Sequence, residues 1–220
     1  MPLPIPLPMP TRTPTDRRRT LRLVAALAAL AGALVWPAHA QTEPFTLIQL
    51  TQLLAQVKTG EATFTEKRAV AVLERTLEST GRLSFEAPDT FVRETLKPRR
   101  EKLAVVGNTV TMSQGTRSRT LALDAVPEAA VIVEAVRGTL TGNRDALERL
   151  FTTRVSGAAQ RWSLELVPRD WRLREQVASV RVAGTQSVLR EVTVTLADGD
   201  RSVMTIEPVP PSPKPASAPG

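Results

Sequence analysis

The chain has 220 residues and a mass of 23.9 kDa, with 29 basic and 22 acidic residues, one histidine, and neither cysteine nor tyrosine. Its length suits one domain or two small ones, and 42% apolar residues are enough for a buried core. The lack of cysteine excludes a disulfide, a thiolate zinc site, an iron–sulfur cluster and a lipid-modified N-terminal cysteine.

Residues 1–40 have the composition of an export signal. A proline-rich extension precedes a basic cluster and a short apolar run at 23–35, followed by Ala38-His39-Ala40. This order predicts a disordered extension and a secretory signal peptide that is cleaved after Ala40. The alternative, a membrane-anchoring helix, would need roughly 20 apolar residues, more than the run supplies. The pair Arg18-Arg19 also fits twin-arginine export, and the sequence does not decide between the two routes.

Cleavage would change the chemistry available to the mature protein. It would remove the only histidine, His39, and leave 24 basic and 21 acidic residues in 41–220, which does not indicate nucleic-acid binding. Ser–His–Asp catalysis, Cys–His catalysis and histidine metal sites could not be assembled. We therefore expect no metal, no cofactor and no enzyme activity, although a carboxylate pair or a lysine leaves catalysis open.

The first element of the mature chain is expected to be a helix. Thr46 and Gln49 form a capping-box pattern, with Phe45 and Leu50 placed as a hydrophobic staple. Apolar residues then recur at steps of three and four, and Gly60 is the expected end of the helix.

After Gly60 the apolar period changes to two, which indicates strands. The candidate strands before the next helices are 61–70, 76–87, 90–96, 101–107, 109–114 and 118–123. A nearly all-apolar helix is expected at 128–137, closed by Gly138, and Asn143 should cap a second short helix. Phe151 is expected on the apolar side of that second helix. Later strands are expected at 160–167, 177–183, 188–197 and 201–208, with a plain turn at 198–200 and a disordered proline-rich tail at 209–220.

About ten strands joined by short turns predict one curved antiparallel sheet. The expected fold is mainly β with an α lid. It is an incomplete antiparallel barrel in which the leading helix and a two-helix insertion cover an apolar cavity. Periodicity alone fits a solid core as well as a lipid cavity. The candidate cavity residues are Phe64, Leu83, Phe85, Phe91, Leu103, Val105, Met112, Leu121, Leu123, Trp162, Leu164, Val194 and Met204.

Three segments resemble the LolA-type lipoprotein carriers: Ala62-Thr63-Phe64-Thr65-Glu66-Lys67, residues 81–91 and residues 162–168. The resemblance extends over nearly all of the expected domain, 41–208. It implies a periplasmic chaperone of Gram-negative bacteria, in transient contact with membranes, that holds the acyl chains of its cargo in a lidded apolar cavity. A monomer is the default expectation. It also implies an inner-membrane transporter of the LolCDE type, or another exporter, as donor and an outer-membrane acceptor. The missing N-terminal cysteine argues against the lipid-anchored, LolB-like relative.

The chain departs from this family at its latch. Ala87 stands where typical carriers have an arginine that hydrogen-bonds the lid, so Arg68 and Arg93 become the latch candidates. The lid residues would be Val131, Ile132 and Val136. We interpret the chain as a divergent member whose cargo is a lipoprotein or another acylated envelope molecule, such as a glycolipid or polyene lipid.

Two other features leave their roles open. The cluster Lys97, Arg99, Arg100 and Lys102 fits either docking to a partner or anionic headgroups, or a solvated loop. Trp171 fits either membrane contact or a packed loop. A regulatory binding module that senses envelope stress through the same fold is the alternative to a carrier, and an enzyme on this fold is the third class.

Overall fold

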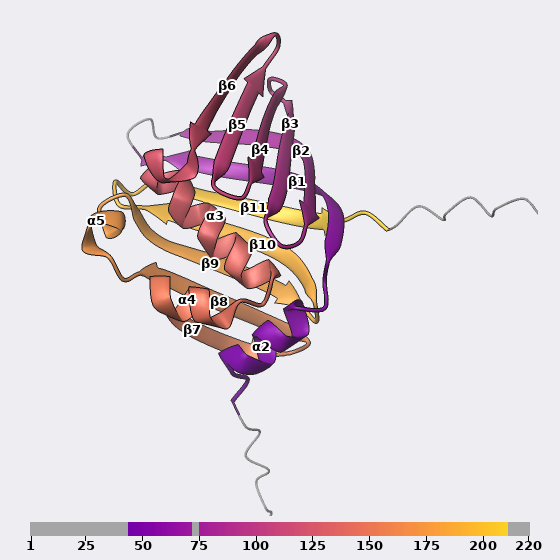
Figure 1. Ribbon diagram of the computed structural model, residues 1–220, viewed down its shortest axis with the longest axis vertical. Coiled ribbons are helices and arrows are strands. Elements are labelled where there is room, and N and C mark those ends of the chain that lie inside the picture. The colour runs from indigo at the N-terminus through magenta and orange to yellow at the C-terminus, as the bar shows by residue number, and fades with distance from the viewer. Residues whose placement is uncertain (1–43, 72–74, 211–220) are drawn as a thin grey trace, which may run out of the picture. The chain divides into compact units, whose positions relative to one another are not determined.

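The computed structural model describes residues 44–71 and 75–210 (Figure 1). The expected signal peptide and residues 211–220 of the expected tail lie outside these ranges. Within them, every helix is too short or too polar to cross a membrane.

Eleven strands form one antiparallel sheet in the order β6-β5-β4-β3-β2-β1-β11-β10-β9-β8-β7, and the sheet does not close into a barrel. The strands are β1 (Thr59–Val70), β2 (Arg75–Glu86), β3 (Thr90–Lys97), β4 (Glu101–Val106), β5 (Thr109–Gln114), β6 (Arg117–Ala122), β7 (Phe151–Ala158), β8 (Arg161–Pro168), β9 (Val177–Thr185), β10 (Val188–Leu196) and β11 (Arg201–Pro208). The expectation of a mainly β, incompletely closed antiparallel fold is therefore confirmed.

The two halves of the chain meet at the pairing of β1 with β11. Phe64 lies opposite Ile206 on one side and Gly81 on the other. Each half then continues outward through hairpins, β2 to β6 in one direction and β10 to β7 in the other (Figure 1). Because neighbouring strands follow one another along the chain, short turns suffice for nearly every connection.

Helix α2 (Leu47–Leu54) begins as the sequence predicts. The Thr46 hydroxyl accepts from the Gln49 amide, and the Gln49 side chain accepts from the Thr46 amide in return, so the capping box is complete. The expected end at Gly60 is wrong. The helix stops at Leu54, and Gly60 already lies in β1, where it pairs with Phe85.

Helices α3 (Pro127–Leu140) and α4 (Arg144–Leu150) follow β6 and the short 3₁₀ helix η2 (Leu123–Ala125). Asn143 caps α4 as expected by accepting from the Ala146 amide. Gly138 does not end α3, which continues to Leu140. Gly138 instead gives Leu147 room, since a Cβ atom there would lie 2.7 Å from the Leu147 Cδ2 atom. The glycine thus marks a close helix contact and not a stop signal.

The sequence reading missed one strand and one helix. Phe151 begins β7 and does not belong to the side of α4, so five strands follow the helices where four were expected. The strand carries few apolar residues because it forms one edge of the sheet, which weakens the alternation. The short helix α5 (Trp171–Arg174) is capped by Asp170, whose side chain accepts from the Arg172 amide.

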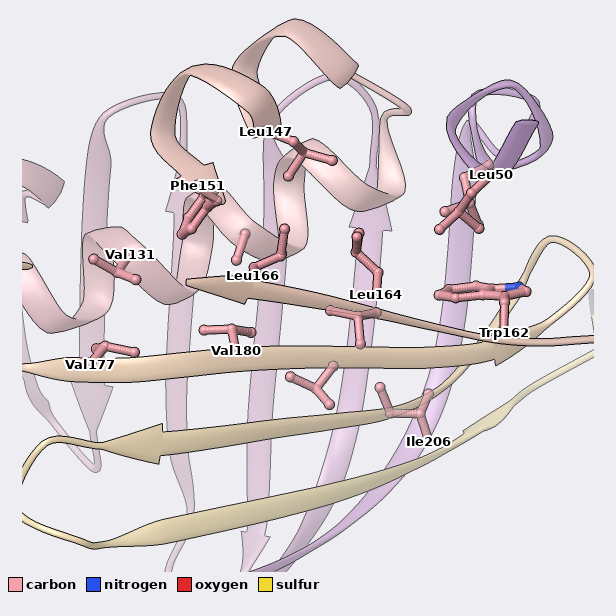
Figure 2. Close-up of a cluster of buried hydrophobic side chains, with 14 residues drawn as sticks. Leu50, Val131, Leu147, Phe151, Trp162, Leu164, Leu166, Val177, Val180 and Ile206 are labelled. Atoms are coloured by element: carbon pink, nitrogen blue, oxygen red, sulfur yellow. The ribbon is translucent and has the colours of Figure 1, made fainter. Parts of the chain in front are cut away.

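The main core lies between the helices and the half-sheet β7–β11. Figure 2 shows Leu50 of α2 and Leu147 of α4 reaching toward the sheet, where Trp162 and Leu164 are buried. A second, smaller cluster joins Val105, Val110 and Leu123 to α3. Helix α3 therefore packs against both halves of the sheet.

Candidate functional site

The expected cavity residues fall into three regions of one sheet face. The first region belongs to the main core. Trp162 and Leu164 are buried beneath the helices, and Leu83, Val194 and Met204 pack at the edge of the same cluster. In this region, the residues expected to line a cavity pack against side chains of the helices.

The second region lies beneath the other side of α3. Val105 and Leu123 are buried there, and Phe91 and Leu103 pack against them. Phe85 stacks on Phe91 with 5.0 Å between ring centroids. Two more of the expected residues, Phe64 and Leu121, lie on the same face. Phe64 lies opposite Gly81 of β2, and Leu121 lies opposite Val110 of β5.

The third region is a hollow of about 380 Å³ over β3 to β6, next to the second region. Of the expected cavity residues it contains Leu103 and Met112, and Met112 is 39% exposed. The rest of its lining is polar and charged, which the apolar pattern did not indicate. Lys102, from the basic cluster noted in the sequence, belongs to this lining, and the lining residues that sequence reasoning missed are Thr95, Glu101, Ser113, Gln114, Arg117, Ser118 and Arg119.

The lid residues named from sequence all face the main core. Val131 is buried in it, and Ile132 and Val136 pack against it. The α3 residues that contact the second region are Ala129, Ala130 and Val133. Both sides of α3 are thus apolar, which agrees with a helix sequence that is apolar almost all round.

A polar network crosses the centre of the same sheet face. The Glu66 carboxylate accepts from the Ser79 hydroxyl at 3.1 Å, from the Arg93 guanidinium and from the Ser202 hydroxyl. The Arg93 guanidinium also lies 4.8 Å from the centre of the Phe64 ring, a cation–π contact. Glu66 was missed as a site residue, although it stands two positions after Phe64 and therefore on the same face.

The two latch candidates hold parts of the sheet. Arg93 binds Glu66, and Arg68 binds Asp200 at 3.1 Å. Asp200 also accepts from the Ala71 amide at 3.0 Å, so it ties the end of β1 to the turn before β11. Each of these ion pairs joins one strand region to another.

A different arginine connects α3 to the sheet. Arg137 donates to the Gly107 carbonyl in the β4–β5 turn at 2.6 Å. Its guanidinium lies 5.9 Å from the centre of the Phe91 ring and is held by Glu134 one turn earlier in the helix. The sequence signal for this contact was a basic residue in the last turns of a helix otherwise rich in apolar residues.

This face of the sheet combines apolar surface with charged side chains. Across residues 44–71 and 75–210, no group of three or more His, Cys, Asp or Glu side chains is placed to hold a metal ion. The face offers aromatic and aliphatic surface under α3, and cationic side chains beside it.

The family model described as "Outer membrane lipoprotein carrier protein LolA-like" matches residues 39–206. No curated protein matches the chain in sequence. A crystal structure of a LolA superfamily protein from Nitrosomonas europaea is similar at 9% identity, with 74% of this chain and 91% of that chain covered and a TM-score of 0.40. An outer membrane lipoprotein-sorting protein domain from Vibrio parahaemolyticus has 9% identity, coverages of 76% and 92%, and a TM-score of 0.43. The MucA/MucB complex of Pseudomonas aeruginosa has 15% identity, coverages of 78% and 56%, and a TM-score of 0.37.

Proposed function

Since the chain belongs to the family of LolA-like outer membrane lipoprotein carrier proteins, we propose that it binds the acyl chains of a lipoprotein or another acylated envelope molecule and carries them between membranes. The observation that supports this proposal is the second region, where α3 covers aromatic and aliphatic residues that continue into an open hollow.

The contact between α3 and this half of the sheet is small. Three buried residues, Val105, Val110 and Leu123, form it, with partly buried neighbours around them. On the other side, α3 contributes Val131 and Ala135 to a core of fourteen buried residues. An acyl chain that entered from the hollow would therefore displace the smaller contact, the one that α3 makes in the second region. The apolar surface of the acyl chain would then take the place of the apolar surface of α3.

The energetics suit a carrier. Burying one CH₂ group is worth about 0.8 kcal/mol, so a 16-carbon chain gains on the order of 10 kcal/mol. A membrane offers a similar gain, so the transfer between protein and membrane is close to balanced and needs no covalent step. The Arg137 contact with Gly107 would act as the latch that keeps the apolar surface covered when no chain is bound.

The proposal places the protein in the bacterial periplasm as a monomer. A membrane transporter or exporter would supply the cargo and an outer-membrane acceptor would receive it. Trp171 is 57% exposed, with the Arg172 guanidinium 5.5 Å from its ring centre. An exposed tryptophan beside cations suits a brief contact with a membrane interface.

Native mass spectrometry of the protein purified from a bacterial envelope tests the proposal. We expect a fraction of the protein to carry a bound acylated molecule, which the mass would identify. A transfer assay should then show this molecule moving between two sets of vesicles in the presence of the protein. Protein that binds a partner domain and moves no lipid would instead indicate a regulatory module. Protein without bound or transferred acyl chains would contradict the proposal.

A further inference from the structure

The hollow over β3 to β6 has a graded lining, and the strand register shows how it is ordered. The row Phe91, Val105, Val110 and Leu121 runs across the four strands and is entirely apolar. Its central residues, Val105 and Val110, are covered by α3. Because side chains in one cross-strand row share a face of the sheet, this row forms the apolar end of the surface.

The next row is mixed. Leu103 and Met112 lie opposite one another in its middle, with Arg93 beyond Leu103 and Arg119 beyond Met112. All four line the hollow. Two residues further along the strands, the lining becomes polar, with Glu101, Gln114 and Arg117. The surface therefore changes from apolar to polar and charged within three rows.

The charges at the polar end are not balanced. The rows that face the hollow contain three basic residues, Arg93, Arg117 and Arg119, and one acidic residue, Glu101. Arg93 is paired with Glu66, and Glu101 accepts from the Gln114 amide at 2.7 Å. In the part of the chain that the structure describes, neither Arg117 nor Arg119 takes part in an ion pair. Two guanidinium groups are therefore free to bind an anion.

We propose that the cargo carries an anionic headgroup that Arg117 and Arg119 bind, while its acyl chain runs over Leu103 and Met112 toward Val105 beneath α3. This inference rests on the proposed function and specifies the class of cargo as an anionic amphiphile. A volume of about 380 Å³ is near the lower end for small-molecule pockets, about 300–1,000 Å³, so the hollow suits a headgroup and the start of a chain. Arginine matches the oxygens of a phosphate or carboxylate with paired N–H donors.

In Figure 1, the β5–β6 hairpin extends beyond α3, and β6 is the last strand of the sheet at that end. A headgroup held by this edge strand would stay in contact with water while the chain reached the covered row. The arrangement would thus orient the cargo as well as attract it, because charge and apolar surface lie at opposite ends of the hollow.

The test measures the affinity of the purified protein for two lipids with the same acyl chain, lysophosphatidylglycerol and lysophosphatidylcholine, below their critical micelle concentrations. We expect the anionic lipid to bind about tenfold more tightly, since hydrogen bonds to charged groups contribute in this range. The double variant Arg117→Gln and Arg119→Gln should lose this preference and keep its affinity for the zwitterionic lipid. The variant with lysine at both positions should keep most of the preference.

The matched control replaces Arg82 and Arg190 with glutamine. Both are exposed arginines outside the hollow, so this variant has the same change in net charge. The inference is overturned if the control loses the preference as the first variant does, or if wild-type protein binds both lipids equally. In the second case acyl-chain binding, and with it the proposed function, would stand. Failure to bind either lipid would instead overturn the proposed function and this inference together.

Discussion

Arg93 on β3 reaches across β2 to the carboxylate of Glu66 on β1, so an ion pair joins two strands that are not neighbours in the sheet. Ser79 on the intervening strand donates to the same carboxylate, and Ser202 donates from β11. Side chains from three strands thus donate to one acceptor on a fourth strand. This network neutralises Arg93, the one arginine of the lining that has a carboxylate partner.

We expect Glu66→Gln to destabilise the protein by about 1–3 kcal/mol. The neutral amide presents donors to a site whose neighbours are themselves donors, and the Arg93 guanidinium loses its counter-charge. The Glu66 side chain is only 16% exposed, so water can replace these bonds only in part. Urea unfolding of both proteins gives the difference. Glu78→Gln, on an exposed position of β2, serves as the control and should change stability by less than about 0.5 kcal/mol. Equal effects of the two substitutions would show that the network contributes nothing specific.

Arg137→Ala should loosen α3 from the β4–β5 turn. The substitution removes the hydrogen bond to the Gly107 carbonyl and the contact with the Phe91 ring, at a cost of about 0.5–1.5 kcal/mol. Hydrogen exchange should become faster at the amides of α3, and an apolar fluorescent dye should bind more strongly to the empty protein. Arg144→Ala removes a half-buried arginine of α4 that pairs within its own helix, and it should leave both readings unchanged. Unaltered exchange in α3 of the Arg137 variant would exclude Arg137 as a latch.

Gly81→Ala should destabilise the protein by about 3 kcal/mol or more. A Cβ atom at this position would overlap the backbone carbonyl of Glu94 and lie 2.7 Å from the Phe64 Cε1 atom, so strand β3 or the buried ring would have to move. Gly60→Ala provides the comparison within the same strand pair, because no atom lies within 4 Å of its Cβ position. That variant should lie within about 0.5 kcal/mol of wild type. Thermal or urea unfolding of the two variants decides the matter, and a mild effect at Gly81 would contradict the tight packing of Phe64.

Trp162→Phe should cost about 1–3 kcal/mol. The indole is 2% exposed and donates to the Gln186 carbonyl at 2.8 Å, and the smaller ring would leave that acceptor unpaired and a space beside Gly184. Trp171→Phe changes a tryptophan that is 57% exposed and should affect stability by less than about 0.5 kcal/mol. Urea unfolding followed by circular dichroism gives the difference for both variants. Similar losses in both would argue against the buried position of Trp162.

The sequence predicted those elements whose pattern is local. The Thr46–Gln49 capping box and the Asn143 cap depend on residues a few positions apart, and both are found where they were expected. The strands with clear alternation were likewise placed to within one or two residues. The family resemblance, read from three short segments, is confirmed by the match over residues 39–206.

The sequence could not predict what depends on distant partners. The sequence around Gly138 does not predict its contact with Leu147. The glycine therefore looks like a helix stop, although it marks a contact between two helices. Glu66 meets Arg93 and Ser202 only through the sheet register, over separations of 27 and 136 residues. The charged lining of the hollow is equally non-local, because Arg119 becomes a neighbour of Leu103 and Met112 only once β4, β5 and β6 are paired.

The pairing of β1 with β11 has a consequence for how the chain acquires its structure. The two strands that form the middle of the sheet are separated by most of the domain, with Ala69 opposite Arg201 and Ala62 opposite Pro208. Contacts between such distant segments close late, and folds rich in them reach the native state slowly. The hairpins on either side can form while the polypeptide is still emerging, but the sheet cannot be joined until its last strand is released. Until then β1 would lack its native partner, and an unpaired strand edge of this kind is open to aggregation.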